Sequence, residues 1–174
     1  MKILGIDPGT ISTGYGFIEK DGRRLHHLDN GEIVPPKNLS ISQRLKWIHD
    51  HLIDLIGYHQ PEVLAVEDIF YSKNVQSSIR LGYARGVVLL SGAQSGLEVR
   101  EYSPMEVKLA VVGYGRATKE QVQEMVKRLL KIQISSNLNA SDALATAICH
   151  AHTDSARFNA SRPMLHSMGG FRNR

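Results

Sequence analysis

The chain has 174 residues, of which 42% are hydrophobic and 22% charged, a composition that fits one globular domain and excludes collagen-like, mucin-like and largely disordered proteins. The formal net charge is +4, but residues 1–72 carry 7 Lys or Arg against 10 Asp or Glu, whereas residues 73–131 carry 10 against 5. An acidic front and a basic middle fit an acidic catalytic or metal-binding centre beside a polyanion-binding surface, and equally a random scatter of surface charge.

Apolar runs separated by Gly and Pro predict five strands. The turn Pro8-Gly9 follows the first strand, and Asp21-Gly22 joins the second and third into an antiparallel hairpin. The predicted strands are residues 2–7, 14–19, 25–34, 63–67 and 97–102.

Apolar residues at helical spacing predict five helices. The first begins after Ser40 or Ser42, either of which can cap it, and carries Leu45, Ile48 and Leu52 on one face. The other helices are residues 75–94, a helix that starts at Pro104, residues 118–130 and residues 140–151. This order of elements predicts an α/β fold with a five-stranded mixed sheet flanked by helices.

The end of the chain differs from the rest in composition. From about Thr153 it has no apolar period, and only Asp154 offsets its arginines, which are Arg157, Arg162, Arg172 and Arg174. We therefore expect one domain over residues 1–152 and a flexible basic tail over residues 153–174.

Cysteine content and hydropathy indicate where the protein works. The single Cys149 excludes an intramolecular disulfide and suits a reducing compartment. The N-terminal apolar run stops at Asp7, too early for a signal peptide, and no run approaches the ~18 apolar residues that span a bilayer. We expect a cytoplasmic protein that does not contact a membrane.

Four side chains with oxygen ligands stand where open α/β sheets bind ligands. Asp7 closes the first predicted strand and Glu67 the fourth, while Asn139 and Asp142 lie three residues apart near the start of the last helix, hence on one face. Oxygen ligands without His or Cys spacing favour Mg²⁺ or Mn²⁺. Each position also has a purely structural explanation, since Asp7 stands in a turn and Asp142 is an acid near a helix start.

Four regions of the sequence resemble the RuvC family of Holliday junction resolvases. They are residues 5–10 (GIDPGT) with 13–16 (TGYG), residues 65–70 (AVEDIF), residues 103–108 (SPMEVK) with 113–122 (GYGRATKEQV), and residues 140–145 (ASDALA). A GIDPG motif alone would be weak, because actin-like ATPases and sugar kinases have a similar turn. The four regions together, in the family's order across nearly the whole predicted domain, are specific.

The resemblance implies a ribonuclease-H-like fold, a homodimer, and Mg²⁺-dependent cleavage of four-way DNA junctions in recombination and repair by symmetric nicking of two strands of like polarity. It implies that Asp7, Glu67, Asp142 and the residue at position 139 are the catalytic and metal-binding set, holding two Mg²⁺ ions per site with Mn²⁺ as a substitute. It also implies the RuvA and RuvB branch-migration proteins as partners.

Position 139 departs from the family pattern, which has Asp where this chain has Asn139. An amide oxygen is a weaker ligand than a carboxylate, and the site loses a negative charge. We therefore expect weak Mg²⁺ binding and deficient cleavage. A natural asparagine and one introduced so that DNA is bound without being cut both fit the sequence.

Cationic and aromatic residues after Glu67 are candidates for DNA binding, because phosphate neutralisation supplies much of the affinity. The resemblance places Lys108 and Lys119 near the scissile phosphate. Phe70 and Tyr71 would stack on unpaired bases at the junction centre, with core packing as the alternative. The remaining candidates are Lys73, Arg80, Arg85 and Arg116, whereas solvated helix faces are the alternative for the cations Lys127, Arg128 and Lys131.

Three classes of function are compatible with parts of the sequence. A structure-specific endonuclease is the leading interpretation, and Asn139 keeps a non-catalytic junction-binding protein as the alternative. An actin-like ATPase or sugar kinase needs two lobes and a second phosphate loop, for which 174 residues leave no room.

Overall fold

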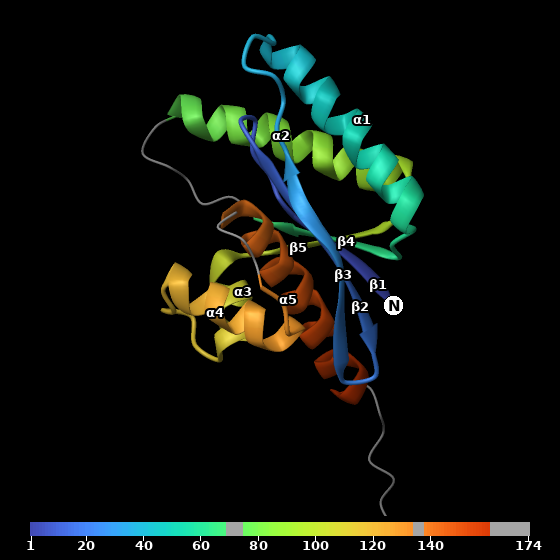
Figure 1. The fold of residues 1–174 in the computed structure, drawn as a ribbon, viewed down its shortest axis with the longest axis vertical. Helices are drawn as coiled ribbons and strands as arrows, with labels where there is room; N and C mark the ends of the chain where they lie inside the picture. The colour runs from blue at the N-terminus through green and yellow to red at the C-terminus, as the bar shows by residue number, and fades with distance from the viewer. Residues whose placement is uncertain (69–74, 134–137, 161–174) are drawn as a thin grey trace, which may run out of the picture.

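A computed structural model describes residues 1–68, 75–133 and 138–160, without the side chains of Leu138 and residues 155–160. These residues form one five-stranded sheet in the order β3-β2-β1-β4-β5 (Figure 1). The strands are β1 (Lys2–Asp7), β2 (Thr13–Asp21), β3 (Arg24–Ile33), β4 (Val63–Glu67) and β5 (Glu98–Tyr102). β1, β2 and β3 pair antiparallel, while β1, β4 and β5 pair parallel, so the predicted mixed sheet is confirmed.

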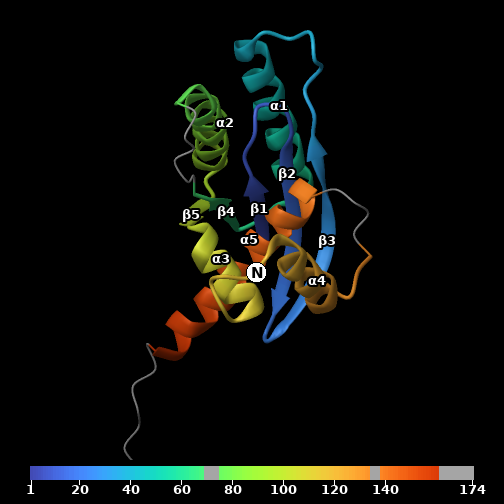
Figure 2. The ribbon, with the colours of Figure 1, turned by 90° about the vertical axis from the view of Figure 1, so that its left-hand side faces the viewer.

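Helices cover both faces of the sheet (Figures 1 and 2). They are α1 (Ile41–His59), α2 (Val75–Gln94), α3 (Pro104–Val112), α4 (Lys119–Leu130) and α5 (Leu138–Ala160). Of the two predicted caps, Ser40 is the one that caps α1. In the described part of the chain, no helix is both long and apolar enough to cross a membrane.

The predicted end of the last helix at residue 151 is wrong, because α5 continues to Ala160. Two contacts support this extension. One is tertiary, since Lys20 Nζ lies 2.8 Å from Asp154 Oδ2, and the other is local, since Thr153 Oγ1 donates to the Cys149 carbonyl at 2.9 Å. An apolar period cannot reveal such contacts. The proposed domain boundary at residue 152 remains a prediction, and residues 161–174 lie outside the described residues.

Alternating side chains of the sheet build two separate cores. Leu4 and Ile6 of β1 pack with α1 and α2, whereas Ile3 of the same strand packs with α3, α4 and α5. The second core includes Cys149, whose burial raises the pKa of its thiol to about 12, so this cysteine is a packing residue.

Glycines let α5 approach the sheet more closely than any side chain would allow. A Cβ atom on Gly5 of β1 would lie 2.0 Å from the Ala143 carbonyl oxygen. On β2, a Cβ on Gly14 would lie 2.1 Å from the carbonyl oxygen of Asn139. The first turns of α5 therefore rest on backbone, and the helix cannot shift without opening the core.

We expect Gly5→Ala to destabilise the protein by about 2–3 kcal/mol, because the new methyl group must displace the α5 backbone. Gly57→Ala is the matched control, because Gly57 lies in α1 and a Cβ atom there would have no other atom within 4 Å. This substitution should raise the free energy of unfolding by about 0.5–1 kcal/mol. Urea denaturation measures both. Equal stability of the two variants would contradict the close-approach argument.

Candidate active site

The ends of neighbouring strands place acidic side chains in one row across the sheet. Ile6 pairs with Val66, so Asp7 and Glu67, the next residues, end adjacent parallel strands. Their side chains share the α5 face, because Gly5 and Ala65, two residues earlier, also face α5. Strands in a sheet lie about 4.8 Å apart, so the two carboxyl groups are neighbours.

α5 brings the third acid to this row. Asp142 lies one turn after Asn139, whose backbone rests on Gly14, the partner of Asp7 in β2. Asp142 lies close enough to Asp7 and Glu67 for its negative charge to raise the pKa of both. The structure therefore brings together the three carboxylates predicted from the sequence, with Asn139 beside them at the start of α5.

Two capped helices place lysines opposite the acids. Ser103 and Thr118 each form a capping box, which fixes the starts of α3 and α4 at this edge of the sheet. Lys108 of α3 and Lys119 of α4 line a cavity of about 240 Å³ together with Glu67 and Asp142. Lys119 Nζ lies 2.5 Å from Asp142 Oδ2.

Burial and mutual repulsion make these acids hard to ionise. Burial, followed by the charge of Asp142, raises the pKa of Asp7 to about 7. Burial, followed by the charges of Asp7 and Asp142, raises the pKa of Glu67 to about 7. Burial also raises the pKa of Asp142, although its bond to Lys119 opposes this effect. Burial lowers the pKa of Lys119, but its bond to Asp142 and the surrounding acids outweigh that effect and raise it overall. Excess negative charge held in a partly buried pocket is the setting in which a cation binds.

The chemistry of the three acidic side chains fits a hard divalent cation. Asp7, Glu67 and Asp142 supply only oxygen ligands, which Mg²⁺ and Mn²⁺ prefer. Among the described residues, no three Asp, Glu, His or Cys side chains are grouped closely enough to hold an ion in this arrangement. The Lys119 ammonium group instead neutralises Asp142 and would have to move aside for an ion to use that carboxylate.

The other predicted DNA-binding residues are not gathered at this cavity. Phe70, Tyr71 and Lys73 lie outside the described residues. Arg80 of α2 lines a different cavity, of about 470 Å³, on the opposite face of the sheet. Arg116 is exposed in the segment between α3 and α4.

The sequence did not reveal a fourth acid that lies near the other three. Glu32 of β3 pairs with Gly14, which pairs with Asp7, so Glu32 stands in the same row two strands away from Asp7. Its charge contributes to the raised pKa of Asp7. The antiparallel hairpin could have revealed it, but only with the register of both strand pairs known.

Asp68, next to Glu67, serves the opposite face of the sheet. Arg85 of α2 lies 3.2 Å from its Oδ1 atom and also pairs with Glu101 of β5. The Asp68 N–H donates to the Tyr102 carbonyl at 2.7 Å. The chain is therefore held immediately after Glu67, and Arg85 neutralises Asp68 and Glu101 within the protein, while a contact of Arg85 with DNA stays a prediction.

The chain is similar to known proteins over most of its length. Residues 3–150 match the family of the crossover junction endodeoxyribonuclease RuvC. The RuvC protein of Syntrophotalea carbinolica is 55% identical over 152 residues, which is 87% of this chain and 94% of that protein. The RuvC protein of Pelobacter propionicus is 44% identical over 173 residues, which is 99% of this chain and 98% of that protein. A solved structure of RuvC from T. thermophilus in complex with a Holliday junction substrate aligns with a TM-score of 0.84 at 31% identity, covering 94% of this chain and 99% of that one.

These similarities cover nearly the whole chain and agree in fold. The chain belongs to the RuvC family of crossover junction endodeoxyribonucleases, and its sheet is ribonuclease-H-like.

The raised pKa values of Asp7 and Glu67 predict a pH-dependent stability. Between about pH 4 and 7 the folded protein keeps protons that the unfolded chain has released, so stability falls as the pH rises through this range. Asp7→Asn should therefore stabilise the protein at pH 8 by about 1–2 kcal/mol, with the gain fading toward pH 4. Urea denaturation in EDTA at both pH values measures this difference.

Asp54→Asn, which changes an exposed acid on α1, is the control and should leave the pH profile as in the unmodified chain. A gain from Asp7→Asn that is independent of pH would mean that charge is not its cause.

Proposed function

We propose that this chain is a metal-dependent, structure-specific endonuclease whose substrate is a four-way DNA junction. The observation that carries the proposal is the convergence of Asp7, Glu67 and Asp142 from three separate elements. Two of these acids, Glu67 and Asp142, line one cavity together with Lys108 and Lys119. The family membership supports the nuclease class, and the junction bound to the T. thermophilus relative supports the substrate.

The proposed roles follow from charge. Asp7, Glu67 and Asp142 would hold Mg²⁺, with the Asn139 amide oxygen as a weak further ligand. Bound divalent cations supply Lewis-acid chemistry, in which a water is activated and charge on the leaving 3′ oxygen is stabilised. Lys108 and Lys119 would contact phosphate oxygens, and the starts of α3 and α4 direct the positive ends of two helix dipoles toward the same cavity.

Asn139 sets the expected activity of this particular chain. It occupies the first turn of α5, on the helix face that carries Asp142, so its side chain is near the acids but brings no charge. We propose that the chain binds junctions well and cleaves them poorly. A protein that only binds junctions is the corresponding second candidate, supported by the same residue.

Asn139→Asp should raise junction nicking in Mg²⁺ at least tenfold, because the carboxylate adds a charged ligand. Asp7→Asn in the Asn139→Asp background should abolish nicking. Denaturing gels with an end-labelled four-way junction measure both rates, and gel shifts against linear duplex measure binding.

Equal, fast nicking by the unmodified chain and by Asn139→Asp would disprove the deficiency. Binding without preference for the junction over duplex would disprove the proposed substrate. Tight, selective binding with no nicking in either chain would favour the binding protein.

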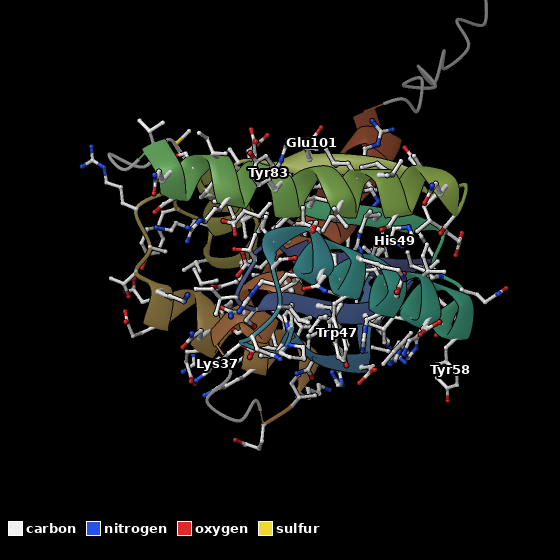
Figure 3. All side chains as sticks on the ribbon, turned by 90° about the horizontal axis from the view of Figure 1, so that it is seen from above. Lys37, Trp47, His49, Tyr58, Tyr83 and Glu101 are labelled. Carbon is white, nitrogen blue, oxygen red and sulfur yellow. The ribbon has the colours of Figure 1, made fainter. Side chains whose placement is uncertain are left out.

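A homodimer is part of the proposal, and α2 offers a surface for it. Val75, Ile79, Tyr83 and Leu90 are all exposed apolar residues of this helix, with Val75 71% exposed. Their spacing of four, four and seven residues places them along one side of the helix. Figure 3 shows Tyr83 on α2, beside α1. Exposed apolar stripes of this size mark association surfaces.

Tyr83→Glu should convert the protein from a dimer to a 19.3 kDa monomer at micromolar concentration, because a charge enters the apolar stripe. Light scattering after gel filtration measures the mass. Tyr58→Glu, at an 83% exposed aromatic on α1, is the control and should remain dimeric. A monomeric unmodified chain would rule out this surface.

Other expectations from the sequence stay predictions. They are base stacking by Phe70 and Tyr71, phosphate contacts by Lys73, Arg80 and Arg116, a cytoplasmic location, and partnership with RuvA and RuvB.

A further inference from the structure

A third cavity, of about 450 Å³, lies at the far end of the molecule from the acids. It is formed where the β2–β3 hairpin meets the C-terminal end of α4 and the middle of α5. His152 of α5 lines it, ten residues or about 15 Å along the helix from Asp142. The hairpin end of β2 is about 23 Å from Gly14, at the level of the active site.

The rim of this cavity is cationic. Arg23, Arg24 and Lys131 line it together with three histidines, and none of its described lining residues is acidic. The nearby Asp154 does not neutralise the rim, because its carboxylate is paired with Lys20 at 2.8 Å. Lys131 ends α4 with φ 56°, a left-handed conformation in which glycine is the least strained residue, yet the chain has a cation there.

The floor of the cavity is apolar. Leu25, Leu129 and Ile132 line it and are partly buried, packed against the core formed by α3, α4 and α5. The floor is thus an exposed edge of that core. His152 is held at the side, where its Nδ1 donates to the Ala110 carbonyl at 2.9 Å.

We propose that this cavity, which we call the hairpin groove, binds a short acidic segment of a partner protein that also carries apolar side chains. Charge complementarity selects an acidic ligand, and the apolar floor selects one with side chains to bury. DNA phosphates would use the cations but gain nothing from Leu25 and Leu129, since nucleic-acid interfaces are mostly polar. The volume is that of a ligand pocket and suits a few residues rather than a broad interface.

The test uses the full chain and three fluorescent probes. The first is a twelve-residue peptide of Asp, Glu and four Leu residues, the second has Ser for each Leu, and the third is a twelve-base-pair duplex. Fluorescence anisotropy measures binding to the unmodified chain, to Arg23→Glu with Arg24→Glu, and to the control Lys37→Glu with Lys46→Glu. The two double variants change the net charge equally, and the control lysines are exposed and lie elsewhere.

We expect the leucine peptide to bind, with about tenfold weaker binding to the Arg23→Glu, Arg24→Glu variant, a change of ~1.4 kcal/mol. The control variant should bind as the unmodified chain does, and the serine peptide at least fivefold more weakly. Amide shifts in ¹⁵N spectra should concentrate at residues 23–27 and 129–132.

The proposal would be overturned by equal losses of peptide affinity in both double variants, by equal binding of the serine and leucine peptides, or by duplex affinity that falls as much as peptide affinity in the Arg23→Glu, Arg24→Glu variant. Shifts centred on Lys108 and Lys119 would also overturn it, because the peptide would then occupy the cavity beside the acids. Junction binding should stay within twofold in both double variants. If the unmodified chain failed to bind junctions, the proposed function would fail while the peptide result stood.

Discussion

The arrangement of the whole site depends on the contact between α5 and the glycines of β1 and β2. The backbone at Asn139 and Ala143 occupies the space that side chains on Gly14 and Gly5 would fill, and the side chain of Leu144 occupies the corresponding space above Gly16. This contact sets the depth at which Asp142 stands above Asp7. It also explains why an Ala-rich helix is used here, because Ala143 and Ala147 are small enough to meet a strand directly.

A second constraint is the electrostatic cost of gathering the acids. Burial and repulsion raise the pKa of both Asp7 and Glu67 to about 7, so ionising these acids at this edge of the sheet destabilises the fold. Lys119 offsets part of this cost through Asp142. The close packing of α5 is what prevents the acids from separating to relieve the repulsion.

The sequence predicted the order and type of all ten elements, because strand and helix periods differ and because Pro and Gly mark most of the turns. It also predicted that Asp7, Glu67 and Asp142 would be candidate site residues, since each ends a strand or stands near a helix start. It did not predict Glu32, whose place depends on register, or the last turns of α5, which rest partly on the Lys20–Asp154 pair. Arg80 shows the same limit, since charge alone could not tell which face of the sheet it would line.

The charges at the site argue for the effect proposed for Asn139. Asp7, Glu67, Asp142 and Glu32 carry four formal negative charges when ionised, and Lys108 and Lys119 carry two positive charges that act on them. The remainder suits one divalent ion, whereas a second ion would leave the pocket with excess positive charge unless DNA phosphate entered with it. An aspartate at position 139 would lower that excess by one unit. In this chain, binding of a second ion should therefore depend on bound DNA more strongly than in a variant with the carboxylate restored.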